Sequence, residues 1–186
     1  GRHGGARAMA QLEEVVRDPE ADPEIRGQAL FALSQTGDAD LAALARLPAG
    51  LNWRWVHIGG GALGDSLRAQ ADGLGLTGRI DWRGACDQPE VIEAMRKADL
   101  FVLPSRVAAD GDRDGLPNVL MEAASQKLPI LSTPVSAIPE FVENGVHGIL
   151  VEDAPDKIAR EIVSFAAREN AGQSFAETAY ARLFKD

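Results

Sequence analysis

The sequence predicts an α/β fold in which a parallel sheet is flanked by helices. From residue 39 onward, short apolar segments alternate with amphipathic ones, an order typical of parallel strands joined by helical crossovers. The segment Leu100–Leu103 is wholly apolar, as expected of a strand that is covered on both faces. The chain has 186 residues, which is enough for one domain, or for one domain with an appendage.

The individual elements follow from hydrophobic periodicity and from helix-capping residues. Strands are predicted at 53–58, 79–83, 100–103, 129–132 and 148–151, with a turn at 137–142. Helices are predicted at 39–47, 65–74, 87–98, 118–126 and 155–168, followed by a last helix. Asp87 is expected to cap its helix, with Pro89 and Glu90 in the first turn, and Ser174 with Glu177 predicts a capping box for the last helix.

The first 38 residues allow two interpretations. Asp22-Pro23-Glu24 is a strong helix start, and the apolar residues that follow it recur at helical spacing up to Leu33. Together with a short helix at Met9–Arg17, this segment resembles a HEAT repeat. The alternative is that Ala29–Ser34 forms the first strand of the sheet. The capping signals favour the helix, so we expect a helical appendage over residues 1–38 and a lobe over residues 39–186.

Charge and cysteine content narrow the range of partners. The net charge of −9 and the isoelectric point near 4.8 argue against binding to nucleic acid or to anionic lipid. Cys86 is the single cysteine, so an internal disulfide is excluded and a cytoplasmic setting is expected. We find no apolar run of membrane-spanning length and no signal-peptide core, although an apolar patch could still provide a peripheral membrane contact.

The segment Asp110–Glu122 is the centre of the functional prediction. It begins as an acidic, glycine-bearing loop and becomes a helix at Pro117, which suits a first helical position. Asp114 lies just before this helix and Glu122 about one turn inside it. Backbone N–H groups at a helix start attract phosphate, and a carboxylate deeper in the helix can accept both hydroxyls of a ribose diol. Phosphate beside a diol is the chemistry of a nucleotide-sugar.

The sequence DGLPNVLMEAASQKLPILSTPVSAIPEFVENGVHGILVE resembles the donor-binding half of family 4 glycosyltransferases. The hallmark of that family is a pair of acids eight positions apart, here Asp114 and Glu122, followed by an I-P-E turn, here Ile138–Glu140. The resemblance extends over roughly residues 40 to 165. It implies one lobe of an enzyme with two facing Rossmann-like lobes, with the acceptor lobe absent from these residues. The acidic DGDRDG run resembles the branch that builds exopolysaccharides.

The resemblance also implies a reaction and a set of site residues. The reaction is transfer of a sugar, with retention at the anomeric carbon, from a nucleotide-sugar to a glycan or lipid-linked acceptor, without a metal cofactor. Glu122 would bind the ribose and Asp114 the donor sugar. The remaining donor-binding residues would be Arg83 and Gly84, which line the base, and Gly115, Leu116, Pro117 and Asn118, whose backbone approaches sugar and phosphate.

Two alternatives remain at this point. Gly59–Gly64 matches the dinucleotide fingerprint G-x-G-x-x-G, with Asp81 on the next strand, and would indicate an NAD(P)-dependent oxidoreductase. The stretch Gln35–Asp38 lacks the basic residues that the family uses to hold the diphosphate, which would suit a non-catalytic interaction protein. Asp110 and Asp112 also imitate metal motifs, but a calcium loop requires a glutamate where Met121 stands.

Overall fold

The computed structural model describes residues 30–34, 38–106, 115–168 and 170–185. These residues form a six-stranded sheet in the order β3-β2-β1-β4-β5-β6, and every neighbouring pair is parallel. The strands are β1 (Leu30–Ser34), β2 (Trp53–Ile58), β3 (Ile80–Gly84), β4 (Leu100–Leu103), β5 (Ile130–Ser132) and β6 (Ile149–Leu150). This is the doubly wound order typical of Rossmann-like domains, as predicted.

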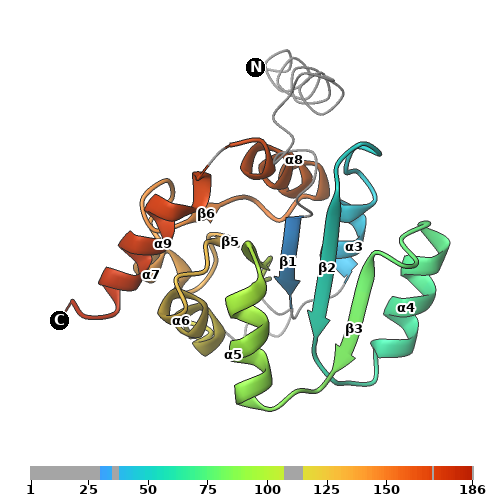
Figure 1. Ribbon diagram of the computed structural model, residues 1–186, viewed down its shortest axis with the longest axis horizontal. Helices are drawn as coiled ribbons and strands as arrows, with labels where there is room; N and C mark the ends of the chain where they lie inside the picture. The colour runs from blue at the N-terminus through green and yellow to red at the C-terminus, as the bar shows by residue number, and fades with distance from the viewer. Residues whose placement is uncertain (1–29, 35–37, 107–114, 169, 186) are drawn as a thin grey trace.

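Helices cover both faces of the sheet (Figure 1). One apolar cluster packs α3 (Asp38–Leu44), α4 (Gly64–Gly73) and α8 (Pro155–Ala166) against the strands. A second cluster on the opposite face contains α5 (Gln88–Lys97), α6 (Asn118–Ser125), α7 (Ile138–Phe141) and α9 (Ala171–Arg182). Within the described part of the chain, none of these helices has the length and apolar character required to cross a membrane.

Strand β4 shows why the sheet needs helices on both faces. All four of its residues are buried. Leu100 and Val102 belong to the first apolar cluster, whereas Phe101 and Leu103 belong to the second. Because successive side chains of a strand point to opposite faces, a wholly apolar strand is stable only between two layers. The prediction for this segment is confirmed.

The helical prediction is wrong for Leu30–Ser34, which form strand β1. This strand pairs with β2 from Leu30↔Trp53 onward and with β4 from Ala32↔Leu100 onward, so it lies at the centre of the sheet. The capping signals at residues 22–24 are local, and pairing with strands from distant parts of the chain overrides them here. A lobe that began at residue 39 would exclude this central strand. The N-terminal boundary of the lobe therefore lies at or before residue 30. Most of the segment that resembles a HEAT repeat, at residues 1–29 and 35–37, lies outside the described residues.

Two predicted helix starts also need correction. Helix α9 begins at Ala171 after Asn170, so Ser174 lies inside the helix and forms no capping box with Glu177. The earlier start is compatible with close packing at Gly172, where an added Cβ would meet Pro129. The sequence predicts Pro117 as the first helical residue of α6. Its backbone is extended and it is the N-cap, so the helix begins at Asn118.

Helix α5 begins with the capping box that the sequence predicts, and this gives a first testable prediction. The Glu90 N–H donates to Asp87 Oδ1 and the Asp87 N–H donates to Glu90 Oε2, both at 3.0 Å. We expect Asp87→Ala to lower the free energy of unfolding by about 1 kcal/mol, because one helix-start N–H loses its acceptor. Urea unfolding monitored by circular dichroism measures this loss. Asp65→Ala is the control, since Asp65 lies in the first turn of α4 without a capping bond, and an equal loss there would contradict the assignment.

Candidate functional site

The carboxyl ends of all six strands lie at one edge of the sheet, since the strands are parallel. The strand order reverses between β1 and β4, because β2 and β3 follow on one side and β5 and β6 on the other. Connections that leave a sheet in opposite directions open a crevice at that point, and ligands of doubly wound folds bind there. The chain that leaves β4 leads to Gly115 and then into α6. The predicted donor segment therefore ends beside the expected binding crevice.

The start of α6 is held firmly while its polar groups stay available. Leu120, Ala123 and Ala124 are buried in the second apolar cluster and fix the helix against the sheet. The N-cap residue Pro117 provides no side-chain capping bond, and within the described residues no acidic side chain lies in the first turn. Gly115 is exposed and has open space around its Cα, and the Asn118 side chain is exposed as well. An anion could therefore approach the backbone N–H groups of this turn directly.

Glu122 lies about one turn inside α6, with its side chain half-buried. Its carboxylate oxygen Oε1 accepts a hydrogen bond from Gln88 Nε2 at 3.4 Å. None of the ion pairs among the described residues involves Glu122. The carboxylate thus keeps acceptor sites for a ligand. Asp114, its predicted partner eight positions earlier, lies outside the described residues, as do Asp110 and Asp112.

Arg83 and Gly84 lie at the same edge, at the end of β3. Arg83 Nε donates to Asp81 Oδ2 at 2.8 Å, and the Gly84 carbonyl accepts from the Gly59 N–H at 2.9 Å. Gly84 has a φ of +68°, which turns the chain sharply toward α5. The contact between Gln88 and Glu122 links the connection after β3 to α6. The two predicted groups of donor-binding residues are therefore connected through one side chain that the sequence did not single out.

The glycine run Gly59–Gly64 follows β2, which is not a strand of the switch point. In dinucleotide-binding domains the fingerprint follows the strand that borders the crevice, which here is β1. A Cβ at Gly60 would lie 3.1 Å from Ala85 Cβ, so this glycine allows two neighbouring connections to pack closely. The geometry thus favours a packing role for this loop over nicotinamide binding.

Three contacts that sequence reasoning missed anchor the chain as it leaves β4. The Ser132 hydroxyl donates to the Leu103 carbonyl and the Thr133 hydroxyl to the Ser105 carbonyl, each at 2.6 Å. Arg106 forms an ion pair with Asp153, which lies beyond β6. The one signal in the sequence is the Ser-Thr pair that directly follows the apolar part of β5. These contacts hold the chain in place as far as Arg106, the last described residue before Gly115.

His57 lies buried near the carboxyl end of β2, with its ring centroid 5.0 Å from that of Trp82. Burial lowers the pKa of His57 below its usual 6.5, and the positive charge of Arg68 lowers that pKa further. The imidazole is therefore neutral at physiological pH. No set of three or more His, Cys, Asp or Glu side chains among the described residues could hold a metal ion.

The lowered pKa of His57 predicts a pH-dependent stability. Below pH 6.5 the unfolded chain binds a proton at His57 that the folded chain does not bind, so the free energy of unfolding falls as pH falls from 6.5 toward the folded pKa. We expect His57→Gln to flatten this part of the curve of stability against pH, as measured by urea unfolding between pH 5 and about pH 7.5. His147, whose pKa is also lowered, is present in both proteins and cancels. Parallel curves for the two proteins would contradict the prediction.

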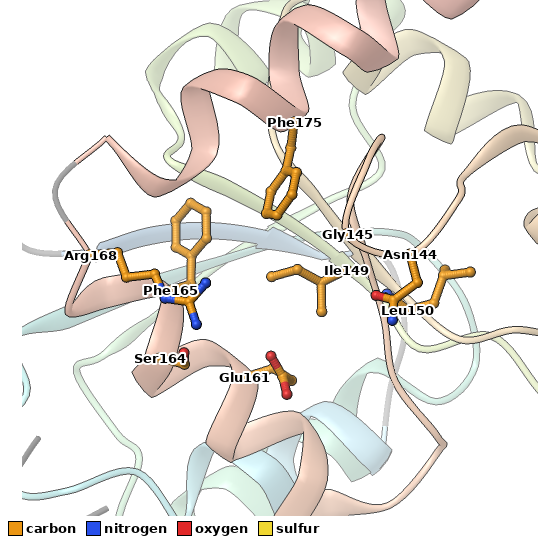
Figure 2. Close-up of a pocket in the computed structure, with 9 residues that line it drawn as sticks. All are labelled: Asn144, Gly145, Ile149, Leu150, Glu161, Ser164, Phe165, Arg168 and Phe175. Atoms are coloured by element: carbon orange, nitrogen blue, oxygen red, sulfur yellow. The ribbon is translucent and has the colours of Figure 1, made fainter. Parts of the chain in front are cut away.

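A separate hollow of about 180 Å³ lies elsewhere on the domain (Figure 2). Figure 2 shows Phe165 and Phe175 on one side of it and Glu161 below, with Asn144 and Gly145 from the turn before β6. The turn leads into β6 and therefore lies at the amino end of that strand. Helix α8 starts at the carboxyl edge after β6 and returns along the sheet, so its second half, which lines the hollow, lies at the amino ends of the strands as well. It contains none of the predicted donor-binding residues.

Comparison with known proteins identifies the family. Residues 38–168 match the model described as "Glycosyl transferases group 1". The chain belongs to this glycosyltransferase family. Over 123 residues it is 39% identical to the amylovoran biosynthesis glycosyltransferase AmsK of Erwinia amylovora, and this match covers 66% of the chain and 29% of AmsK. The match thus spans less than a third of the length of that curated glycosyltransferase.

Solved glycosyltransferase structures share the fold. HepE of Anabaena, crystallised with UDP and glucose, aligns with a TM-score of 0.70 and 19% identity over 94% of this chain and 47% of HepE. The C-terminal domain of LpcC, a group 1 glycosyl transferase of Francisella tularensis, aligns with a TM-score of 0.66 and 19% identity. That alignment covers 91% of this chain and 94% of the LpcC domain. The present chain therefore has the fold of one lobe of these glycosyltransferases.

Proposed function

We propose that this chain is the donor-binding domain of a retaining glycosyltransferase in polysaccharide biosynthesis. The observation that carries the proposal is the arrangement around α6. Its start, where Pro117 provides no side-chain cap, and the Glu122 carboxylate, one turn further on, lie at the carboxyl edge of the sheet beside the switch point. Membership of the glycosyltransferase family supports the same assignment.

In the proposed mechanism the chain binds and orients the nucleotide-sugar. The N–H groups at the start of α6, next to Gly115–Pro117, stabilise the negative charge that develops on the departing diphosphate. Glu122 accepts the ribose hydroxyls, and Asp114 orients the donor sugar. Arg83 and Gly84 line the base at the end of β3. The proposal includes no metal, as the family resemblance implies, and the helix start supplies electrostatic stabilisation.

The acceptor would be bound by a second lobe. The chain aligns with 47% of HepE, which leaves about half of such an enzyme to hold the acceptor. AmsK is named for the biosynthesis of a polysaccharide, amylovoran, and this supports a glycan or lipid-linked acceptor. With a lipid-linked acceptor the enzyme would work in the cytoplasm, at the inner face of the membrane.

Calorimetric titration of the intact chain tests the proposal. The ligands are UDP, GDP, UDP-glucose, GDP-mannose and NADH. We expect saturable binding of one nucleotide-sugar together with its nucleoside diphosphate. Binding of NADH alone would overturn the proposal and move the site to Gly59–Gly64. Failure of all five ligands to bind would also overturn it and would favour a non-catalytic interaction protein.

A further inference from the structure

Gln88 lies where the connection after β3 meets α6. It is the first residue of α5. Asp87 and Glu90, which precede and follow the Gln88-Pro89 pair, form the capping box that fixes its backbone. Helices α5 and α6 both begin at the carboxyl edge and lie side by side (Figure 1). Two side-chain hydrogen bonds join these helices. Gln88 donates to Glu122 near the carboxyl edge, and Arg96 donates to Gln126 further along. The fold therefore sets the position of the Gln88 backbone, and the hydrogen bond to Glu122 orients its exposed side chain.

The partner of Glu122 is a neutral amide, and this matters for ligand binding. An arginine or lysine in its place would hold the carboxylate through a charge-assisted bond and would compete with incoming hydroxyl groups. The Gln88 amide donates to Oε1, and among the contacts of the described residues Oε2 and further lone pairs of the carboxylate remain available. The donor–acceptor distance of 3.4 Å is long for such a bond, and bonds of this kind tighten when the ligand is in place.

We propose that Gln88 is a positioning residue for Glu122, which it holds so that the free carboxylate lone pairs face the two ribose hydroxyls of a ribonucleotide donor. This inference rests on the proposed function, since it takes Glu122 as the group that binds ribose. A correctly held carboxylate accepts both the 2′ and the 3′ hydroxyl, whereas a freely rotating one must first be ordered. The site therefore prefers ribonucleotides to 2′-deoxyribonucleotides, and the size of that preference depends on Gln88.

The test measures binding of UDP, GDP and their 2′-deoxy counterparts to the intact chain by calorimetry. We expect Gln88→Leu to weaken binding of the ribonucleoside diphosphate about fivefold, the effect of losing one ordinary hydrogen bond. The 2′-deoxy compound has only its 3′ hydroxyl to offer Glu122, so its binding should weaken less and the preference for ribose should shrink. Gln126→Leu is the matched control, because it removes the other side-chain bond between α5 and α6. The Gln126 N–H donates to the Glu122 carbonyl, and leucine retains this backbone bond, so all affinities should stay unchanged.

The outcomes separate this inference from the proposed function. If Glu122→Ala weakens binding but Gln88→Leu does not, the role of Gln88 is overturned and the donor site stands. Equal weakening of the ribo and 2′-deoxy compounds by Gln88→Leu would indicate a merely structural role and would overturn the inference. A wild-type chain without any preference for ribose would overturn it as well. If neither diphosphate binds to the wild-type chain, or if Glu122→Ala has no effect, the donor site at α6 and the role of Gln88 are both overturned.

Discussion

Replacement of Glu122 by alanine is expected to weaken nucleotide-sugar binding by about 100-fold, the largest functional effect that we predict. The carboxylate would accept two ribose hydroxyls, and hydrogen bonds to a charged acceptor contribute about 1.5 kcal/mol or more each. Since about 1.4 kcal/mol corresponds to a factor of ten, two such bonds account for the expected loss. Titration calorimetry with the nucleotide-sugar that binds to the wild-type chain provides the measurement.

Glu161→Ala is the control for this experiment. Glu161 is also a half-buried glutamate in the interior of a helix, but it lines the hollow near the amino ends of the strands. Its removal should leave nucleotide-sugar affinity unchanged. Thermal unfolding of both variants should resemble that of the wild type, because neither glutamate takes part in an ion pair within the described residues. Similar losses of affinity in the two variants would show that the effect is not specific to α6.

Gly172→Ala is expected to lower the free energy of unfolding by about 2–3 kcal/mol, which is typical of overpacking in a buried site. A Cβ at Gly172 would lie 2.3 Å from Pro129 Cγ and 3.0 Å from Phe165 Cζ. The proline ring has little freedom to move away, since its backbone leads directly into β5. Helix α9 would have to shift outward from the sheet. Chemical unfolding of the variant beside the wild type measures the loss.

Gly73→Ala is the control for this prediction, and in the same unfolding measurement we expect it to cause no loss of stability. Gly73 is also a helical glycine, but no atom lies within 4 Å of its added Cβ. Alanine favours helix over glycine by about 0.5–1 kcal/mol, so this variant should be as stable as the wild type or slightly more stable. If both glycine variants lose stability to the same extent, close packing between α9 and Pro129 does not explain the effect.

The parts of the fold that the sequence predicts correctly are those decided by neighbouring residues. The capping box at Asp87 is one example, because both of its partners lie within one helical turn. Leu100–Leu103 is another, because four consecutive apolar residues suit only a strand covered on both faces. The formation of strand β1 depends instead on pairing with Trp53 and Leu100, which lie far along the chain. Local capping signals favour a helix there, and that prediction is wrong.

The candidate site was predictable to a similar extent. The spacing between Asp114 and Glu122, together with the family resemblance, indicated Glu122 and the backbone of Gly115–Asn118. The contact between Gln88 and Glu122 spans 34 positions and exists only because α5 and α6 pack side by side. No periodicity or motif in the sequence carries that information. The same holds for Arg106 and Asp153, which come together through the order of β4, β5 and β6.

The central place of β1 determines how this domain could be shortened. Strand β1 supplies the hydrogen-bonding partners of both β2 and β4. A shortened chain that began at residue 39 would leave these two strands with unpaired edges on either side of a gap. Exposed strand edges are templates for pairing with other chains, so such a fragment would aggregate. The residues that most resemble a removable appendage thus contain the strand that joins the two halves of the sheet.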